Sequence, residues 1–152
     1  MNSEKILQAK GLCKTYSQGV SNVNVLENFD FDVATGECVA VVGTSGSGKS
    51  TLLNLCGGLD DPDDGEVSVC DVKWKDLDSS QRAIWRNQHV GFVYQFHHLL
   101  GEFTALENVA MPTLIGNFPV TEAARRAEKI LEKTGLKQRL NHKPAELSGG
   151  ER

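Results

Sequence analysis

Residues 43–50 carry the clearest chemical pattern in the sequence, a glycine-rich loop that ends in lysine and serine. They read GTSGSGKS and match the spacing G-x-x-x-x-G-K-[ST]. The three glycines let the backbone curl so that successive N–H groups point inward at a phosphate. Lys49 can reach the β- and γ-phosphates of a nucleotide, and the Ser50 hydroxyl can ligate Mg²⁺. The plainer alternative is a glycine turn that happens to precede a lysine.

The segments on either side of this loop favour the nucleotide interpretation. Residues 37–43 (ECVAVVG) form a short apolar run, typical of a strand buried on both faces of a mainly parallel sheet. Residues 48–59 change to helical spacing and end at two glycines that predict a left-handed stop. The loop would therefore sit at the positive N-terminal end of a helix. The predicted nucleotide contacts are Gly43, Thr44, Ser45, Gly46, Ser47, Gly48, Lys49, Ser50 and Thr51.

Strands and helices alternate along the rest of the chain, which predicts an α/β domain over residues 1–152. Period-two patterning predicts strands at 6–16 and 25–33, and residues 89–95 (HVGFVYQ) read as a further strand. Helices are predicted at 78–88, 103–112 and 121–136. The second of these helices has a capping box, with Pro112 marking its end. In the third, Ala123, Ala127, Ile130 and Leu131 share one face.

Composition excludes several classes of protein. The chain has 152 residues and a net charge of −4, so it presents no basic field for nucleic acid or anionic lipid. No apolar run approaches the length of a membrane span, and the first ten residues lack the apolar core of a signal peptide. The four cysteines are widely spaced and form no C-x-x-C pair, which favours reduced thiols over a zinc site. A soluble, cytoplasmic protein is expected.

Three further features are weak when taken alone. Tyr16 lies at the end of the first predicted strand, where an aromatic residue is ordinary. Gln95 ends the 89–95 run, and a polar strand terminus is ordinary too. Residues 147–151 (LSGGE) can be no more than a helix entry with Ser148 as N-cap. Free amides at Ser148, Gly149 and Gly150 would also make a second anion site, far along the chain from the first.

Taken in this order, these residues resemble the ATP-binding subunits of ABC transporters over the whole chain. The resemblance identifies 43–50 as Walker A, Gln95 as the Q-loop and 147–151 as the signature motif. It implies a P-loop nucleotide-binding domain with an N-terminal β subdomain, a partial parallel core sheet and a helical subdomain. The cofactors implied are ATP and Mg²⁺.

In that family two such domains meet head to tail, and each ATP is sandwiched between them. The resemblance therefore implies a homodimer in which Ser148, Gly149 and Gly150 contact the ATP held by the partner's Walker A loop. Tyr16 would stack on the adenine. Gln95 would lie beside Mg²⁺, together with Ser50, and would pass the state of the nucleotide to a membrane partner.

Residues 94–116 resemble more narrowly the ATPases that release lipoproteins from the inner membrane of Gram-negative bacteria. The resemblance implies membrane subunits of the LolC and LolE type, and peripheral attachment to the cytoplasmic face of the inner membrane through them. Phe96, Leu99, Leu100 and Phe103 would contact such a subunit. Macrolide exporters of the MacB type, the cell-division ATPase FtsE and a non-hydrolysing nucleotide-binding fragment are the alternatives.

Family members continue beyond the signature motif into a Walker B strand ending in Asp-Glu, a D-loop and a switch histidine. None of these is found in residues 1–152, where all four histidines precede the signature motif. The resemblance implies that the catalytic base is the Walker B glutamate. We therefore expect these residues to be the N-terminal part of one domain, truncated at the signature motif and inactive in hydrolysis by themselves.

Overall fold

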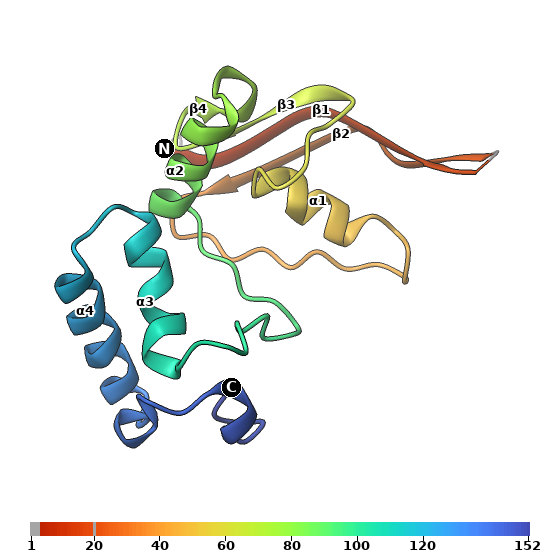
Figure 1. The fold of residues 1–152 in the computed structure, drawn as a ribbon. Coiled ribbons are helices and arrows are strands. Elements are labelled where there is room, and N and C mark those ends of the chain that lie inside the picture. Colours follow the sequence, from red (N-terminus) through yellow and green to blue (C-terminus); the bar gives the residue numbers. More distant parts are fainter. Residues whose placement is uncertain (1–3, 20) are drawn as a thin grey trace. The chain divides into compact units, whose positions relative to one another are not determined.

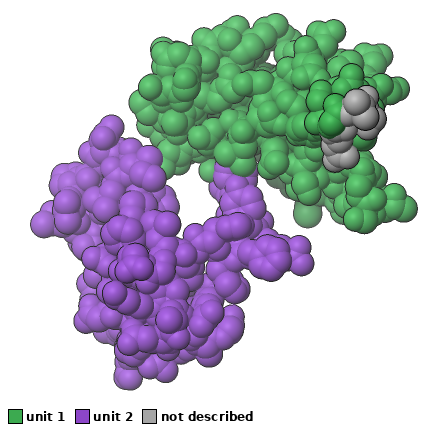
Figure 2. Space-filling view, turned by 45° about the vertical axis from the view of Figure 1, so that its right-hand side comes forward, with its two compact units in different colours: residues 1–90 green, residues 91–152 purple. Residues whose placement is uncertain are grey.

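The computed structural model describes residues 4–19 and 21–152, so residues 1–3 and 20 of the predicted domain lie outside the described residues. The chain forms two compact units, residues 1–90 and 91–152 (Figure 2). The first unit contains β1 (Lys5–Gln18), β2 (Ser21–Ala34), α1 (Lys49–Cys56), β3 (Asp64–Val69), β4 (Val72–Lys73), a 3₁₀ turn (Trp74–Asp76) and α2 (Ser79–His89). The second contains α3 (Ala105–Ile115), α4 (Val120–Lys133) and 3₁₀ turns at Lys137–Arg139 and Pro144–Glu146.

The sheet of the first unit has the order β2-β1-β3-β4, and every neighbouring pair is antiparallel. Its long hairpin, β1 and β2, confirms the strands predicted at 6–16 and 25–33. Ala9 and Leu12 of β1 are fully buried, and both reach the core although they are three residues apart, because the register of β1 shifts between them.

Helix α1 covers one face of this sheet (Figure 1). Leu52 and Leu55 of the helix join Leu12 of β1 and Val67 of β3 in one buried cluster. The helix ends as the two glycines predict, since Gly58 has a φ of +66° and donates its N–H to the Leu55 carbonyl. The packing holds the start of α1, and with it the glycine-rich loop, against the hairpin.

The buried parallel strand predicted at 37–43 and the strand predicted at 89–95 are both wrong for this structure. Residues 37–44 follow an irregular path, and α2 continues through His89 before a second irregular segment. Val42 is 87% exposed and Val93 is fully exposed. An apolar run becomes a buried strand only when a neighbour pairs with it, and no described strand pairs with either segment.

Helices α3 and α4 pack side by side in the second unit through small residues. Ala110 of α3 meets Ala123 and Ala127 of α4, and all three are buried. The capping box predicted for α3 is confirmed: the Thr104 hydroxyl accepts from the Glu107 N–H, and the Glu107 carboxylate accepts from the Thr104 N–H. Among the described residues no helix has both the length and the hydropathy to cross a membrane.

Two details of these helices differ from the sequence prediction. Pro112 does not end α3, which continues to Ile115 and stops where Gly116 donates to the Pro112 carbonyl. A proline removes one N–H bond, and one further turn persists because its other hydrogen bonds form. Ile130 is 52% exposed, whereas Leu131 is buried. The buried stripe of α4 follows i, i+4 spacing through Ala123, Ala127 and Leu131, which turns Ile130 outward.

Candidate functional site

The glycine-rich loop is closed by the side chain of Lys49. Its Nζ donates to the carbonyl oxygens of Gly43, at 2.9 Å, and Thr44, at 2.6 Å, and it lies 3.4 Å from the Ser47 hydroxyl. The ammonium group is therefore held inside the curl of the loop. Phosphate oxygens, which carry full negative charge, are stronger acceptors than these neutral oxygens. The side chain is placed to exchange the loop oxygens for those of a nucleotide.

The path of this loop requires glycine at position 48 and leaves little room for a side chain at position 43. Gly48 has a φ of +85°, and a Cβ atom there would lie 2.7 Å from Val25 Cγ1 and 3.1 Å from the Val25 carbonyl oxygen. A Cβ atom on Gly43 would lie 2.6 Å from the Ser47 hydroxyl. The loop thus lies tightly against β2 on one side and against itself on the other. A side chain at Gly48 would push the loop away from β2, whereas one at Gly43 would have to displace the Ser47 hydroxyl.

The start of α1 supplies groups that suit a phosphate and its metal ion. The first turn reads Lys49, Ser50, Thr51 and Leu52, so its unpaired N–H groups are accompanied by a positive charge. Ser50 is exposed on this turn. Its hydroxyl is a hard oxygen ligand of the kind that Mg²⁺ prefers, and the residues present fit that ion. The remaining predicted contacts of this loop, Ser45 and Gly46, are also exposed.

Tyr16 lies on β1, with 38% of its surface exposed. Its register partner on β2 is Val23, and Lys14, two residues earlier, is paired with Leu26. Leu26 and Val25 are the residues that contact Gly48. The part of the hairpin that carries Tyr16 is therefore one strand away from the residues that support the glycine-rich loop.

Gln95 belongs to the second unit, in the irregular segment that precedes α3. Its neighbours include exposed apolar side chains: Phe96 is 71% exposed, Leu100 47% and Phe103 39%, whereas Leu99 is half-buried. Gln95 is exposed as well, and its amide oxygen suits Mg²⁺. Its proximity to Ser50 stays a prediction, because the two residues lie in different units.

Residues 148–152 form one turn, which directly follows Leu147. Leu147 is buried against Ala105 and Leu131, which anchors the turn to the helices. The N–H groups of Glu151 and Arg152 donate to the Ser148 carbonyl oxygen. Both glycines of the turn, at 149 and 150, are exposed, and a Cβ atom on either would meet nothing within 4 Å. Gly149 and Gly150 thus leave this part of the turn open to a close approach.

Glu151 holds this turn in place. Its carboxylate accepts from Arg139 Nε at 2.8 Å and from the Ser148 N–H at 2.8 Å. The hydrogen bond from Arg139 and then those from Ser148 lower the pKa of Glu151 from 4.5 to about 2. The carboxylate is therefore ionised throughout the physiological range and neutralises the guanidinium beside it.

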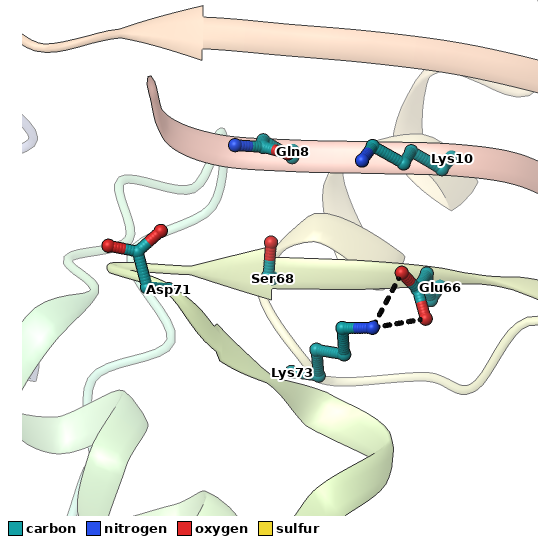
Figure 3. A pocket seen from close by; sticks show the side chains of 6 residues that line it. All are labelled: Gln8, Lys10, Glu66, Ser68, Asp71 and Lys73. Atoms are coloured by element: carbon teal, nitrogen blue, oxygen red, sulfur yellow. Dashed lines mark hydrogen bonds and ion pairs between the residues drawn. The ribbon is translucent and has the colours of Figure 1, made fainter. Parts of the chain in front are cut away.

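A separate polar depression of about 190 Å³ lies on the sheet and contains none of the predicted site residues (Figure 3). Lys73 of β4 pairs with Glu66 of β3 across it, at 2.9 Å. The other lining residues are Gln8, Lys10, Ser68 and Asp71. The glycine-rich loop, in contrast, is an open surface feature in this structure.

Four residues that hold Tyr16 or the turn at Ser148 in place were not predicted from the sequence: Lys14, Asp60, Arg139 and Glu151. A local sequence pattern could have indicated two of them, Lys14 and Glu151. Lys14 stands two residues before Tyr16, so both side chains lie on the same face of β1. Ser148 and Glu151 have the S-x-x-E spacing of a capping box. The contacts that Asp60 makes with Tyr16 and that Arg139 makes with Glu151 join distant segments, and no local pattern indicates them.

Comparison with known proteins places this arrangement in a class. A model of the ABC transporter family matches residues 26–152. The chain therefore belongs to the ABC transporter family, which confirms the P-loop class expected from 43–50. Its structure is similar to the dimeric post-hydrolysis state of the ATP-binding cassette MJ0796 bound to ADP and Pi, with a TM-score of 0.85 and 38% identity. That likeness covers 95% of this chain and 64% of the cassette.

Among curated proteins, the chain is similar to lipoprotein-releasing system ATP-binding proteins named LolD. It is 55% identical to the one from Pseudomonas fluorescens over 152 residues, which cover 100% of this chain and 67% of that protein. It is 53% identical to the one from Idiomarina loihiensis over 150 residues, which cover 99% and 66%. Residues 1–152 thus span about two thirds of the length of these relatives.

Proposed function

We propose that the full-length protein is the ATP-binding subunit of a transporter complex that couples ATP hydrolysis to the release of lipoproteins from the inner membrane. Transport to the outer membrane would follow. The observation that supports nucleotide binding is the closure of the glycine-rich loop by Lys49 Nζ, 2.9 and 2.6 Å from two loop carbonyls. The lipoprotein substrate is supported by the names of relatives at 55% and 53% identity.

The residues of this chain divide the work on ATP. Lys49 neutralises the β- and γ-phosphates, the loop amide N–H groups donate hydrogen bonds to the phosphate oxygens, and Tyr16 stacks on the base. Mg²⁺, when bound through Ser50 and Gln95, would offset charge on the same phosphates. The overall reaction is ATP + H₂O → ADP + phosphate. Residues 1–152 hold the binding groups, and we propose that by themselves they do not hydrolyse ATP.

A second copy of the chain would complete each site. In this proposal the two copies meet head to tail, and the exposed turn at Ser148, Gly149 and Gly150 covers the γ-phosphate held by the partner's loop. The dimeric structures of the similar cassette MJ0796 support this arrangement. The absence of side chains at both glycines suits a close approach to phosphate.

Dimerisation driven by a nucleotide tests this arrangement. Analytical ultracentrifugation of the full-length protein with a non-hydrolysable ATP analogue should show a dimer, and without nucleotide a monomer. Gly150→Val should abolish the dimer yet leave the ATP affinity of the monomer unchanged, because the added side chain meets only open space within its own chain. Nucleotide binding without a dimer, and without phosphate release by the wild type, would instead support a non-hydrolysing module.

The membrane partners are tested by purifying the tagged full-length protein from bacterial membranes. We propose two subunits of the LolC and LolE type, which would hold this peripheral protein at the cytoplasmic face of the inner membrane. Phe96, Leu100 and Phe103 are exposed apolar residues available for that contact, and half-buried Leu99 lies beside them. Recovery of a macrolide-exporter or cell-division subunit in their place would contradict the lipoprotein assignment.

A further inference from the structure

The turn that follows α1 is anchored by several elements of the first unit. Arg86 of α2 donates to the Gly58 carbonyl at 2.7 Å, and Arg82 pairs with the Asp61 carboxylate at 2.5 Å. Trp74 donates its indole N–H to the Cys56 carbonyl at 3.1 Å. Because these contacts come from different elements, the segment that contains Asp60 is held in one position.

Asp60 in this turn bridges two side chains of β1. Its Oδ1 atom lies 3.0 Å from Lys14 Nζ, and its Oδ2 atom accepts a hydrogen bond of 2.8 Å from the Tyr16 hydroxyl. Lys14 Nζ also donates to the Asp61 carbonyl at 2.5 Å. Lys14 is only 9% exposed, which is rare for a lysine. Asp60 is its nearer carboxylate partner and Asp63, at 3.9 Å, its more distant one, so the loss of Asp60 is costly.

The same lysine touches the face of the tyrosine ring. Lys14 Nζ lies over the ring at 5.2 Å from its centroid, within the range of a cation–π contact. The ring is thus restrained twice, at its hydroxyl by Asp60 and on one face by Lys14. The residue is 38% exposed, so part of its surface remains accessible to a ligand.

Partial burial disfavours the charged forms of Asp60 and Lys14, yet both side chains remain ionised. Burial alone would raise the pKa of Asp60, but the hydrogen bonds from Tyr16 and Lys14 outweigh it, and that pKa lies below its usual value. Burial alone would lower the pKa of Lys14, but Asp60 outweighs it, and that pKa lies above its usual value. A charged carboxylate is the stronger acceptor for the Tyr16 hydroxyl.

We infer that Asp60 and Lys14 are positioning residues for the nucleobase: they hold the Tyr16 ring so that one face is open to adenine. The register supports this role, since Lys14 and Tyr16 are paired with the part of β2 that packs on Gly48. The inference rests on the proposed function, in which Tyr16 stacks on the base of ATP.

Calorimetric titration of the full-length protein with two probes tests it. ATP reports base and phosphates together, and inorganic tripolyphosphate reports the phosphates alone. Tyr16→Phe and Asp60→Ala should each weaken ATP binding about fivefold, the usual effect of one lost hydrogen bond, and leave tripolyphosphate binding unchanged. The double variant should be no weaker than Asp60→Ala, because both changes remove the same contact.

Two variants provide controls. Asp60→Asn keeps an oxygen acceptor for the Tyr16 hydroxyl and should bind ATP more tightly than Asp60→Ala. Asp32→Asn removes the carboxylate of another lysine pair, that between Lys5 and Asp32, and should bind both probes as the wild type does. Circular dichroism melting of each variant shows whether the fold persists.

The outcomes separate the inference from the function on which it rests. Equal weakening of ATP and tripolyphosphate by Asp60→Ala would overturn the inference and assign Asp60 a structural role. Additive effects in the double variant would overturn it as well. Tyr16→Ala should weaken ATP binding roughly tenfold to a hundredfold through lost stacking. If it does so while Tyr16→Phe and Asp60→Ala do not, the function stands and the inference fails; if it does not, the stacking role itself fails.

Discussion

The two glycine-containing turns of this protein, at 43–50 and at 147–151, are stabilised in opposite ways. In the first, the backbone requires its glycines: Gly48 has a positive φ, and a Cβ atom there would collide with Val25. In the second, the glycines meet open space, and a buried leucine and a glutamate hold the turn. Glycine thus permits the backbone path of the turn at 43–50, whereas in the turn at 147–151 it keeps the outer surface accessible.

This difference has a functional meaning within the proposed mechanism. A loop that wraps a phosphate with its own amides must curl tightly, and glycine permits the curl. A turn that approaches a phosphate held by another chain has to keep its outer surface clear. Its own stability must then come from side chains on the inner side, such as Leu147 and Glu151.

The largest effect should come from Lys49→Ala in the full-length protein. This change removes the charge held at the centre of the first turn, and we expect ATP affinity to fall by about a hundredfold or more. Isothermal titration calorimetry measures it. Lys10→Ala, which alters a lysine of the polar depression in Figure 3, is the matched control and should leave ATP affinity unchanged. Wild-type binding by Lys49→Ala would refute the assignment of the loop.

The second turn should be most sensitive to Leu147→Ala. Leu147 is 5% exposed and packs on Ala105 and Leu131, so its truncation should lower the free energy of unfolding by about 2–3 kcal/mol. Urea unfolding of the full-length protein gives the value. Ile130→Ala truncates a residue that is 52% exposed in the same unit and should have a smaller effect. Equal losses would mean that Leu147 does not anchor the turn.

Alanine at one glycine of each turn gives the most direct test of the comparison. Gly48→Ala should lower the free energy of unfolding by about 1–3 kcal/mol, through both the positive φ and the contact with Val25. Gly150→Ala should change it by less than about 0.5 kcal/mol, because no atom lies within 4 Å of the new Cβ. Thermal melts of the two variants, run side by side, would contradict the comparison if the order were reversed.

The smallest expected effect is the loss of stability of the second turn at low pH. The pKa of Glu151 is lowered from 4.5 to about 2, so its carboxylate stabilises the folded turn above about pH 4.5. That contribution is lost as the pH falls from about 4.5 towards 2 and Glu151 takes up a proton. The Ser148 amide resonance, followed by NMR, should titrate in that lower range. Arg139→Gln should move its midpoint upward, and an unchanged midpoint would show that Arg139 does not hold Glu151.

Local sequence patterns were sufficient to predict the elements that are stabilised by contacts between nearby residues. The hairpin follows from period-two alternation, α3 from the Thr104 capping box, and the curl of 43–50 from its glycine spacing. The S-x-x-E pattern that begins at Ser148 likewise indicates the contact between Ser148 and Glu151. In each case the interacting groups lie within a few residues of one another or repeat with the period of one element.

Only the tertiary structure decided the features that depend on partners distant in the sequence. The apolar runs at 37–43 and 89–95 have the composition of strands, yet a strand forms only when another segment offers its backbone hydrogen bonds. The bridge from Asp60 to Lys14 and Tyr16 joins residues 44 to 46 positions apart. By itself, the sequence determined the curl of the glycine-rich loop and the class of ligand proposed for it, because that pattern is local. The fold determined which side chains hold the site in place, because those contacts depend on how the chain packs.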